Sequence, residues 1–259
     1  MNQHQINLPV RYHRWHTDPG EHWSEETTDP RVLQWGIPLA QTALVLIDVW
    51  NSHYLHSCNT RVADITVKKV IPFLNRSRAH GLRIIHAPSN PLARQNPWWI
   101  RMIDDSEMKE FCELGDDSWP PAAFRARTGE YSRWAYPVEP REKELDTLRE
   151  KRTFFPGAEP SGNDAVIANG LELHRYCRKE NILFLLFCGF NANACVQLRD
   201  YGIPAMRTRG YCCILLRDCT TGMESPQTLA DLALTNAAVS GFEMFGSYSA
   251  DSAEIEFTG

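Results

Sequence analysis

Apolar residues in this chain gather in short continuous runs, separated by segments in which they recur every three or four positions. The run TALVLI, residues 42–47, ends at Asp48, and the runs LRIIHAP and NILFLLFCGF have the same character. Continuous runs of this length are typical of strands that are buried on both faces of a parallel sheet. Residues 60–80 and 163–179 have helical spacing instead. Strand, helix and strand in alternation predict βαβ units.

Local signals refine the ends of these elements. Gly81 can end the helix predicted over 60–80 in a left-handed conformation. Asn163 or Asp164 can cap the helix predicted over 163–179. A further helix is expected after Cys195, broken where Gly and Pro interrupt the segment ACVQLRDYGIPAMRTRG.

The C-terminal part continues the alternation. YCCILLRDC predicts a strand, PQTLADLALTNAAVSG a helix and FEMFGSY a last short strand. The whole pattern predicts a Rossmann-like α/β fold, a three-layer α/β/α sandwich around a mostly parallel sheet of about six strands.

Two segments do not fit the alternation. Residues 1–41 have no clear period and are expected to form an N-terminal extension packed on the core, which leaves 42–259 as the main domain. Residues 89–141 are rich in Trp and Pro and predict an insertion with short helices that serves as a lid, a pocket wall or an oligomer contact. After it, LDTLREKRTFF is expected to form a short polar strand that ends near Lys151.

Composition narrows the class of partner. The 259 residues are 43% apolar and 23% charged, as in an ordinary globular protein, and the formal net charge is −5. A net negative charge gives no electrostatic drive toward nucleic acid or anionic membranes, so a small molecule is the expected partner. We see no secretory signal pattern and no apolar run of the ~20 residues that span a bilayer, and we therefore expect a cytoplasmic protein.

The eight cysteines show neither framework spacing nor a Cys-x-x-Cys pair, so most are expected to be reduced, buried and structural. Ligands of open α/β sheets bind outside the carboxyl ends of the strands. Asp48, Lys151 and the loop that leads to Cys195 each follow a predicted strand. These three segments are therefore expected to meet at one edge of the sheet.

Three blocks in this order, LVLIDVWN, EKRTFFPG and LFCGFNANACV with GYCCILLRDCTTG after it, resemble the isochorismatase-like cysteine hydrolases. That superfamily includes nicotinamidases, N-carbamoylsarcosine amidohydrolase, and the ureidoacrylate and biuret hydrolases. The resemblance covers about Thr42 to Ser247, and the loop Gly189–Val196 is its most specific part. Ala192 stands where the family commonly has Thr.

The resemblance implies a catalytic triad of Asp48, Lys151 and Cys195. Cys195 would be the nucleophile, with the pKa of its thiol lowered by a helix N-terminus and by Lys151. Asp48 would accept the thiol proton and later deliver it to the departing amine. An oxyanion hole is implied at the backbone N–H groups of Asn191 and Cys195, with a cis peptide between Phe190 and Asn191.

Several residues are candidates for substrate binding, because they are aromatic or lie beside the triad: Trp50, Asn51, Phe155, Trp119 and Ala192. No metal or cofactor is expected, since HAPSNPLARQ stands where nicotinamidases carry an Asp-x-His pair. His53, His56 and His86 are the alternative if a metal binds after all. The resemblance also implies a homodimer or homotetramer.

The expected reaction is hydrolysis of the C–N bond of a small amide, ureide or carbamoyl compound through a thioester on Cys195, with release of ammonia or an amine. One alternative is vinyl ether hydrolysis of the isochorismatase type, in which Asp48 is the acid and the cysteine is incidental. The other is a binding protein that has lost catalysis, which the Ala192 departure and the aromatic insertion leave open.

Overall fold

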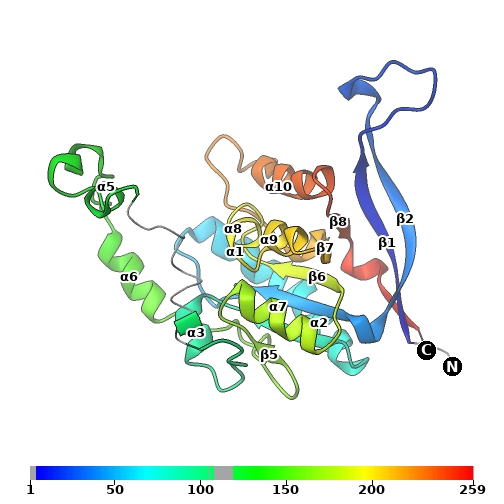
Figure 1. Ribbon diagram of the computed structural model, residues 1–259, viewed down its shortest axis with the longest axis horizontal. Coiled ribbons are helices and arrows are strands. Elements are labelled where there is room, and N and C mark those ends of the chain that lie inside the picture. The colour runs from blue at the N-terminus through cyan, green and yellow to red at the C-terminus, as the bar shows by residue number, and fades with distance from the viewer. Residues whose placement is uncertain (1–3, 105, 108–118, 259) are drawn as a thin grey trace. The chain divides into compact units, whose positions relative to one another are not determined.

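The computed structural model describes residues 4–104, 106–107 and 119–258 (Figure 1). It divides into two compact units. The first consists of Met1–Ile100 with Arg152–Gly259, and the second of Arg101–Lys151.

A single sheet runs through the first unit in the order β2-β1-β8-β7-β6-β3-β4-β5. The six strands from β8 to β5 are parallel to one another, which confirms the predicted parallel α/β core. Their bounds are β3 (Thr42–Ile47), β4 (Arg83–Ala87), β5 (Ala165–Val166), β6 (Phe184–Gly189), β7 (Cys212–Leu216) and β8 (Tyr248–Ala250).

The N-terminal segment adds strands to this sheet. Strands β1 (Gln5–Arg14) and β2 (Asp29–Pro38) pair antiparallel in a long hairpin, which Figure 1 shows beside β8. The short strand β9 (Glu256–Thr258) pairs with the start of β1. Alternate β1 side chains, those of Ile6, Leu8 and Val10, are buried in the core, so the hairpin is held by a period-two apolar pattern.

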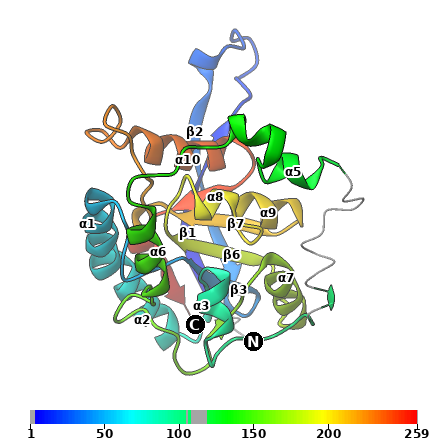
Figure 2. The ribbon, with the colours of Figure 1, turned by 90° about the vertical axis from the view of Figure 1, so that its left-hand side faces the viewer.

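Helices cover both faces of the sheet, and the side chains of β3 alternate between two cores. Leu44 and Leu46 belong to one core, with apolar residues of α1 and α2. Ala43, Val45 and Ile47 belong to the other, with residues of α7, α9 and α10. Full burial of one such branched side chain stabilises a fold by about 1.5–3 kcal/mol. Figure 2 shows α1 and α2 on one side of the sheet and α7 on the other, which confirms the three-layer arrangement.

The helices of the first unit are α1 (His56–Ile65), α2 (Ile71–Ala79), α3 (Asn90–Arg94), α7 (Gly170–Lys179), α8 (Cys195–Leu198), α9 (Ile203–Thr208) and α10 (Ala233–Met244). A π-helical turn, Thr66–Val70, joins α1 to α2. Gly81, with a φ of +74°, follows α2 as predicted. The predicted break between α8 and α9 is also confirmed.

Two predicted element ends are wrong. Helix α7 begins at Gly170, and its cap is Asn169, whose Oδ1 accepts a hydrogen bond from the backbone N–H of Glu172 at 2.9 Å. The residues before it form β5, because Ala165 and Val166 pair with β4. The segment FEMFGSY continues α10 as far as Met244, and only its last residue starts strand β8.

The described part of the second unit is made of short helices, as the sequence predicts for 89–141, although part of that segment lies outside the described residues. They are α5 (Ala122–Arg125), a 3₁₀ helix (Gly129–Trp134) and α6 (Glu142–Glu150). The predicted strand LDTLREKRTFF is wrong, because α6 takes up most of it. Only Leu145 and Leu148, three residues apart, are half-buried in α6, which is the spacing of a helix with one apolar stripe.

None of the helices in the described ranges is both long and apolar enough to cross a membrane.

Candidate active site

Two loops leave the sheet at the same place, at the carboxyl ends of β3 and β6. The two strands are adjacent and parallel, and Ile47 is paired with Gly189 in register. Asp48 follows β3 directly, and Cys195 lies six residues after the end of β6. The register therefore brings the Asp48 loop and the Cys195 loop together.

The loop after β6 turns sharply at its first residues. Gly189 has a φ of +116°, and the N–H of Phe190 donates to the carbonyl oxygen of Ile47 at 2.9 Å. The peptide bond between Phe190 and Asn191 is cis, as the resemblance implies. The Phe190 side chain is buried in the core that also contains residues of α1 and α2, and this packing anchors the turn.

Asn191 is buried and is held on its side-chain amide. Its Oδ1 accepts from the Sγ of Cys58 at 3.3 Å, and its Nδ2 lies 3.3 Å from the Nε2 of His53. Its carbonyl oxygen accepts the N–H groups of Ala194 and Val196. The N–H groups of Asn191 and Cys195 donate to none of the residues that the structure describes, which leaves both available to an oxyanion.

The segment after β7 supports this loop from the side. Ala192 N–H donates to the carbonyl oxygen of Thr221 at 2.9 Å, and Thr220 Oγ1 donates to the carbonyl oxygen of Gly189 at 2.6 Å. The side chain of Asn193 both donates to and accepts from the backbone of Met223. These bonds hold the cysteine loop against the segment Thr220–Met223.

Asp48 is buried, with 1% of its surface exposed, and its φ is +49°. Neither carboxylate oxygen has a hydrogen-bond partner of good geometry among the described residues. Burial raises the pKa of Asp48 to about 6, against the opposing effect of the Arg199 guanidinium. The carboxylate is thus mostly ionised at neutral pH, with a pKa suited to a general base.

Cys195 is half-buried at the start of α8. Burial, and then the negative charge of Asp48, raise the pKa of its thiol to about 12, and Arg199 opposes them. The expectation of a lowered thiol pKa is therefore wrong for this state of the site. Helix α8 has a single turn of four residues, too short to offset burial through its dipole. At neutral pH the proton lies on the sulfur, and the ionised Asp48 is the group that can accept it.

Residues that sequence reasoning did not single out complete the surroundings. The Nη2 of Arg199 lies 3.5 Å from the Oδ2 of Asp48. Tyr201 is buried and donates from its hydroxyl to the carbonyl oxygen of Pro88 at 3.1 Å. The guanidinium carbon of Arg152 lies 3.8 Å from the ring centroid of Trp50. The spacing of Arg199, four residues after Cys195, is the one signal in the sequence that could have indicated it.

Lys151 is exposed and caps the end of α6 in the second unit, so it does not end a strand as predicted. Its catalytic role stays a prediction, and so does that of Trp119, which is exposed in the same unit.

The other candidates for substrate binding lie in the first unit. Trp50 and Phe154 form an isolated β-bridge, and the Oδ1 of Asn51 accepts from Thr153 N–H at 3.0 Å. Phe155 is half-buried, and its N–H donates to the carbonyl oxygen of Val49 at 3.0 Å. These contacts hold the segment after Arg152 against the Asp48 loop. Ala192 is fully buried, and its expected contact with substrate stays a prediction.

The three histidines do not gather at one point. His53 contacts Asn191, His56 is exposed at the start of α1, and the Nε2 of His86 lies 3.0 Å from the Oδ2 of Asp164. Within the described ranges, His, Cys, Asp and Glu form no group of three or more that could hold a metal ion.

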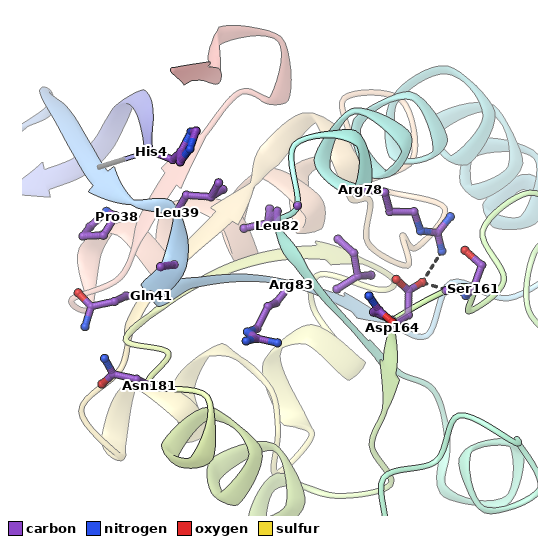
Figure 3. Close-up of a pocket in the computed structure, with 15 residues that line it drawn as sticks. His4, Pro38, Leu39, Gln41, Arg78, Leu82, Arg83, Ser161, Asp164 and Asn181 are labelled. Atoms are coloured by element: carbon purple, nitrogen blue, oxygen red, sulfur yellow. Dashed lines mark hydrogen bonds and ion pairs between the residues drawn. The ribbon is translucent and has the colours of Figure 1, made fainter. Parts of the chain in front are cut away.

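A cavity of about 1110 Å³ lies at the amino ends of the parallel strands (Figure 3). Its lining includes Gln41, Arg83 and Asn181, which stand at the amino ends of β3, β4 and β6. Its guanidinium groups are already paired, Arg78 with Asp164 at 2.5 Å and Arg83 with Glu180 at 2.6 Å. Asp48 stands at the other end of the six-residue strand β3, so this cavity is not the site described above.

Comparisons with known proteins identify structures of similar fold and a matching family. A search of curated proteins finds no match. Among solved structures, the fold is similar to a cysteine hydrolase from Pseudomonas syringae pv. phaseolicola 1448A, with 15% identity, a TM-score of 0.53, and coverage of 85% of this chain and 92% of that one. An N-carbamoylsarcosine amidase from Thermoplasma acidophilum also matches, with 18% identity, a TM-score of 0.45, and coverage of 83% and 99%.

The family model of the isochorismatase domain matches residues 42–246, which include Asp48, the cis-peptide loop and Cys195. The match spans most of the chain and covers β3, β4, β5, β6 and β7 with the helices between them. The chain therefore belongs to the isochorismatase family of hydrolases.

Proposed function

We propose that this protein hydrolyses the C–N bond of a small linear amide, ureide or carbamoyl compound, with Cys195 as nucleophile. One observation carries the proposal: an ionised, buried Asp48 lies beside a cysteine whose loop presents two backbone N–H groups without a protein acceptor among the described residues. A base, a nucleophile and an oxyanion hole are the three parts that acyl transfer needs.

The first half-reaction forms a thioester. The sulfur of Cys195 attacks the substrate carbonyl carbon while its proton passes to the carboxylate of Asp48. The carbonyl oxygen becomes an oxyanion, for which the N–H groups of Asn191 and Cys195 are the donors. When the oxyanion collapses, the C–N bond breaks, and Asp48 returns the proton to the leaving nitrogen.

The second half-reaction restores the enzyme. A water molecule gives a proton to Asp48 and attacks the thioester carbonyl carbon. The C–S bond then breaks, the acid product leaves, and the proton returns from Asp48 to the sulfur. One carboxylate, that of Asp48, therefore accepts and returns the proton in both half-reactions. A pKa of about 6 suits both roles near neutral pH.

A screen for ammonia release tests the proposal with nicotinamide, ureides, biuret and carbamoyl amino acids, with and without a chelator. We expect turnover of at least one compound and a loss of about 10³-fold or more in Cys195→Ala. Cys212→Ala, at a half-buried cysteine on β7, is the matched control and should keep its activity. Full activity of Cys195→Ala on every compound that the wild type hydrolyses would contradict the mechanism.

Vinyl ether hydrolysis is the second candidate, because a buried carboxyl group with a pKa of about 6 can also donate a proton. Activity on isochorismate that survives Cys195→Ser would favour it. If neither screen gives turnover, the binding-protein alternative gains support. The homodimer or homotetramer and the cytoplasmic location stay predictions, and light scattering of the purified protein measures the oligomeric state.

A further inference from the structure

A positive charge lies next to the candidate base, on the residue that directly follows the cysteine's helix. Arg199 follows the single turn of α8, and its Nη2 lies 3.5 Å from the Oδ2 of Asp48. The Asp48 side chain is fully buried, whereas the Arg199 side chain is 40% exposed. An ion pair with one buried partner is weakly screened by solvent, so this contact differs from an ordinary surface salt bridge.

The same residue is fixed relative to the nucleophile. The backbone N–H of Arg199 donates to the carbonyl oxygen of Cys195 at 3.2 Å, which closes the one turn of α8. Side chains four residues apart on a helical turn lie on one face. Arg199 can therefore contact both members of the pair between which the proton moves.

The charged and titratable groups around Arg199 come from three segments. Asp48 follows β3, Cys195 starts α8, and Tyr201 lies two residues after Arg199. Arg152 acts on Asp48 as a second, weaker cation. When the thiol proton passes to Asp48, the net charge of the pair does not change, but the negative charge moves from the carboxylate to the sulfur. A guanidinium that faces both groups can balance the charge before and after this step.

We propose that Arg199 supplies the positive charge of the active site and balances the negative charge on Asp48 and Cys195 in turn, the part that the family resemblance assigns to Lys151. This inference rests on the proposed cysteine-dependent hydrolysis. Arg199 is thus a third functional member of the site, and it directly follows the helix that carries the nucleophile.

Alkylation by iodoacetamide tests the inference without a substrate. The rate of Cys195 carbamidomethylation is measured by peptide mass spectrometry between pH 6 and 10 in the full chain, with Cys212 as internal control. Loss of a neighbouring cation raises the pKa of a thiol by about 1 unit or more, so Arg199→Gln should slow Cys195 about tenfold or more at pH 8. Arg199→Lys keeps the charge and should stay within about threefold of the wild type.

Lys151→Gln is the matched variant at the residue that the resemblance names. The inference predicts that it slows Cys195 less than Arg199→Gln does, and that the Cys212 rate is unchanged in every variant. A wild-type or faster Cys195 rate in Arg199→Gln would overturn the inference. An equal slowing of Cys195 and Cys212 would overturn it too, as would an Arg199→Lys variant in which Cys195 reacts as slowly as in Arg199→Gln. If Cys195→Ala abolishes hydrolysis while Arg199→Gln alkylates normally, the proposed function stands and this inference fails. If Cys195→Ala keeps full hydrolysis, the proposed function itself fails.

Discussion

A Cβ atom on Gly189 would lie 1.9 Å from the carbonyl oxygen of Ile47. The close approach lets the N–H of Phe190 reach the same oxygen and turns the chain into the cysteine loop. The active-site loop therefore depends on a glycine at the end of β6.

Gly189→Ala should destabilise the protein severely, because backbone would have to move and a φ of +116° is strained for alanine. We expect a loss of about 3 kcal/mol or more in the free energy of unfolding, measured by urea denaturation. Gly81→Ala is the control, since Gly81 also has a positive φ but open space around it, and it should cost about 1 kcal/mol. Equal losses in both variants would contradict the role of the close contact.

Burial of the ionised Asp48 carboxylate should destabilise the fold at neutral pH. The pKa of Asp48 is about 6 in the fold, against about 3.9 for an aspartate in an unfolded chain, so the folded state binds the extra proton between these pH values. The protein therefore loses stability as pH rises through this window, by up to about 3 kcal/mol. Asp48→Asn should be more stable than the wild type at pH 7, and the gain should shrink toward pH 4.

Thermal unfolding at the two pH values measures this difference. Asp64→Asn is the control, because the Asp64 side chain is 54% exposed and pairs only with Lys68 among the described residues. It should change stability by about 0.5 kcal/mol or less. A gain in Asp48→Asn that is the same at pH 4 and pH 7 would rule out ionisation of Asp48 as its cause.

The pH dependence of kcat/KM should report the same carboxyl group. The mechanism needs Asp48 ionised, and its pKa is raised to about 6, so kcat/KM should fall about tenfold for each pH unit below 6. The profile is measured on the best compound from the ammonia screen. An acidic limb near pH 4 would mean that a solvated carboxyl group, and not Asp48, controls the rate.

Ala192 departs from the family pattern at a buried position. Its surface is fully buried, and its N–H holds the 220–223 segment. Ala192→Thr adds two heavy atoms to this packing and should cost about 1–3 kcal/mol, measured by urea denaturation. Ala192→Gly, which only removes a methyl group, keeps the hydrogen bond for comparison. A stable Thr variant with a new substrate preference would instead place the residue in substrate selection.

Much of the core could be predicted from the sequence, because its strands are buried on both faces and read as continuous apolar runs. The hairpin of β1 and β2 was missed for the opposite reason. Most β2 side chains are exposed and show no pattern, although the alternation of Ile6, Leu8 and Val10 in β1 was visible. Long hairpin connections also lack the turn signals of short ones.

The candidate site was predictable where a residue follows a buried strand, as Asp48 does. The strand assigned before Lys151 was wrong, because a polar segment with two leucines three residues apart forms a helix there. Arg199 was not predicted, since its proximity to Asp48 depends on the length of α8, a single turn. The pKa of the Cys195 thiol could not be predicted either. Burial raises it more than the nearby positive charge lowers it, and the extent of burial depends on packing that the sequence does not show.

The central claim is that Cys195 forms a covalent bond with the acyl part of the substrate. Acid quenching during turnover, followed by peptide mass spectrometry, measures this bond directly. The account predicts that the peptide containing Cys195 gains the mass of the acyl group minus one hydrogen atom, and that Cys195→Ala shows neither adduct nor turnover. Steady turnover without an adduct at Cys195, together with undiminished turnover in Cys195→Ala, would contradict it.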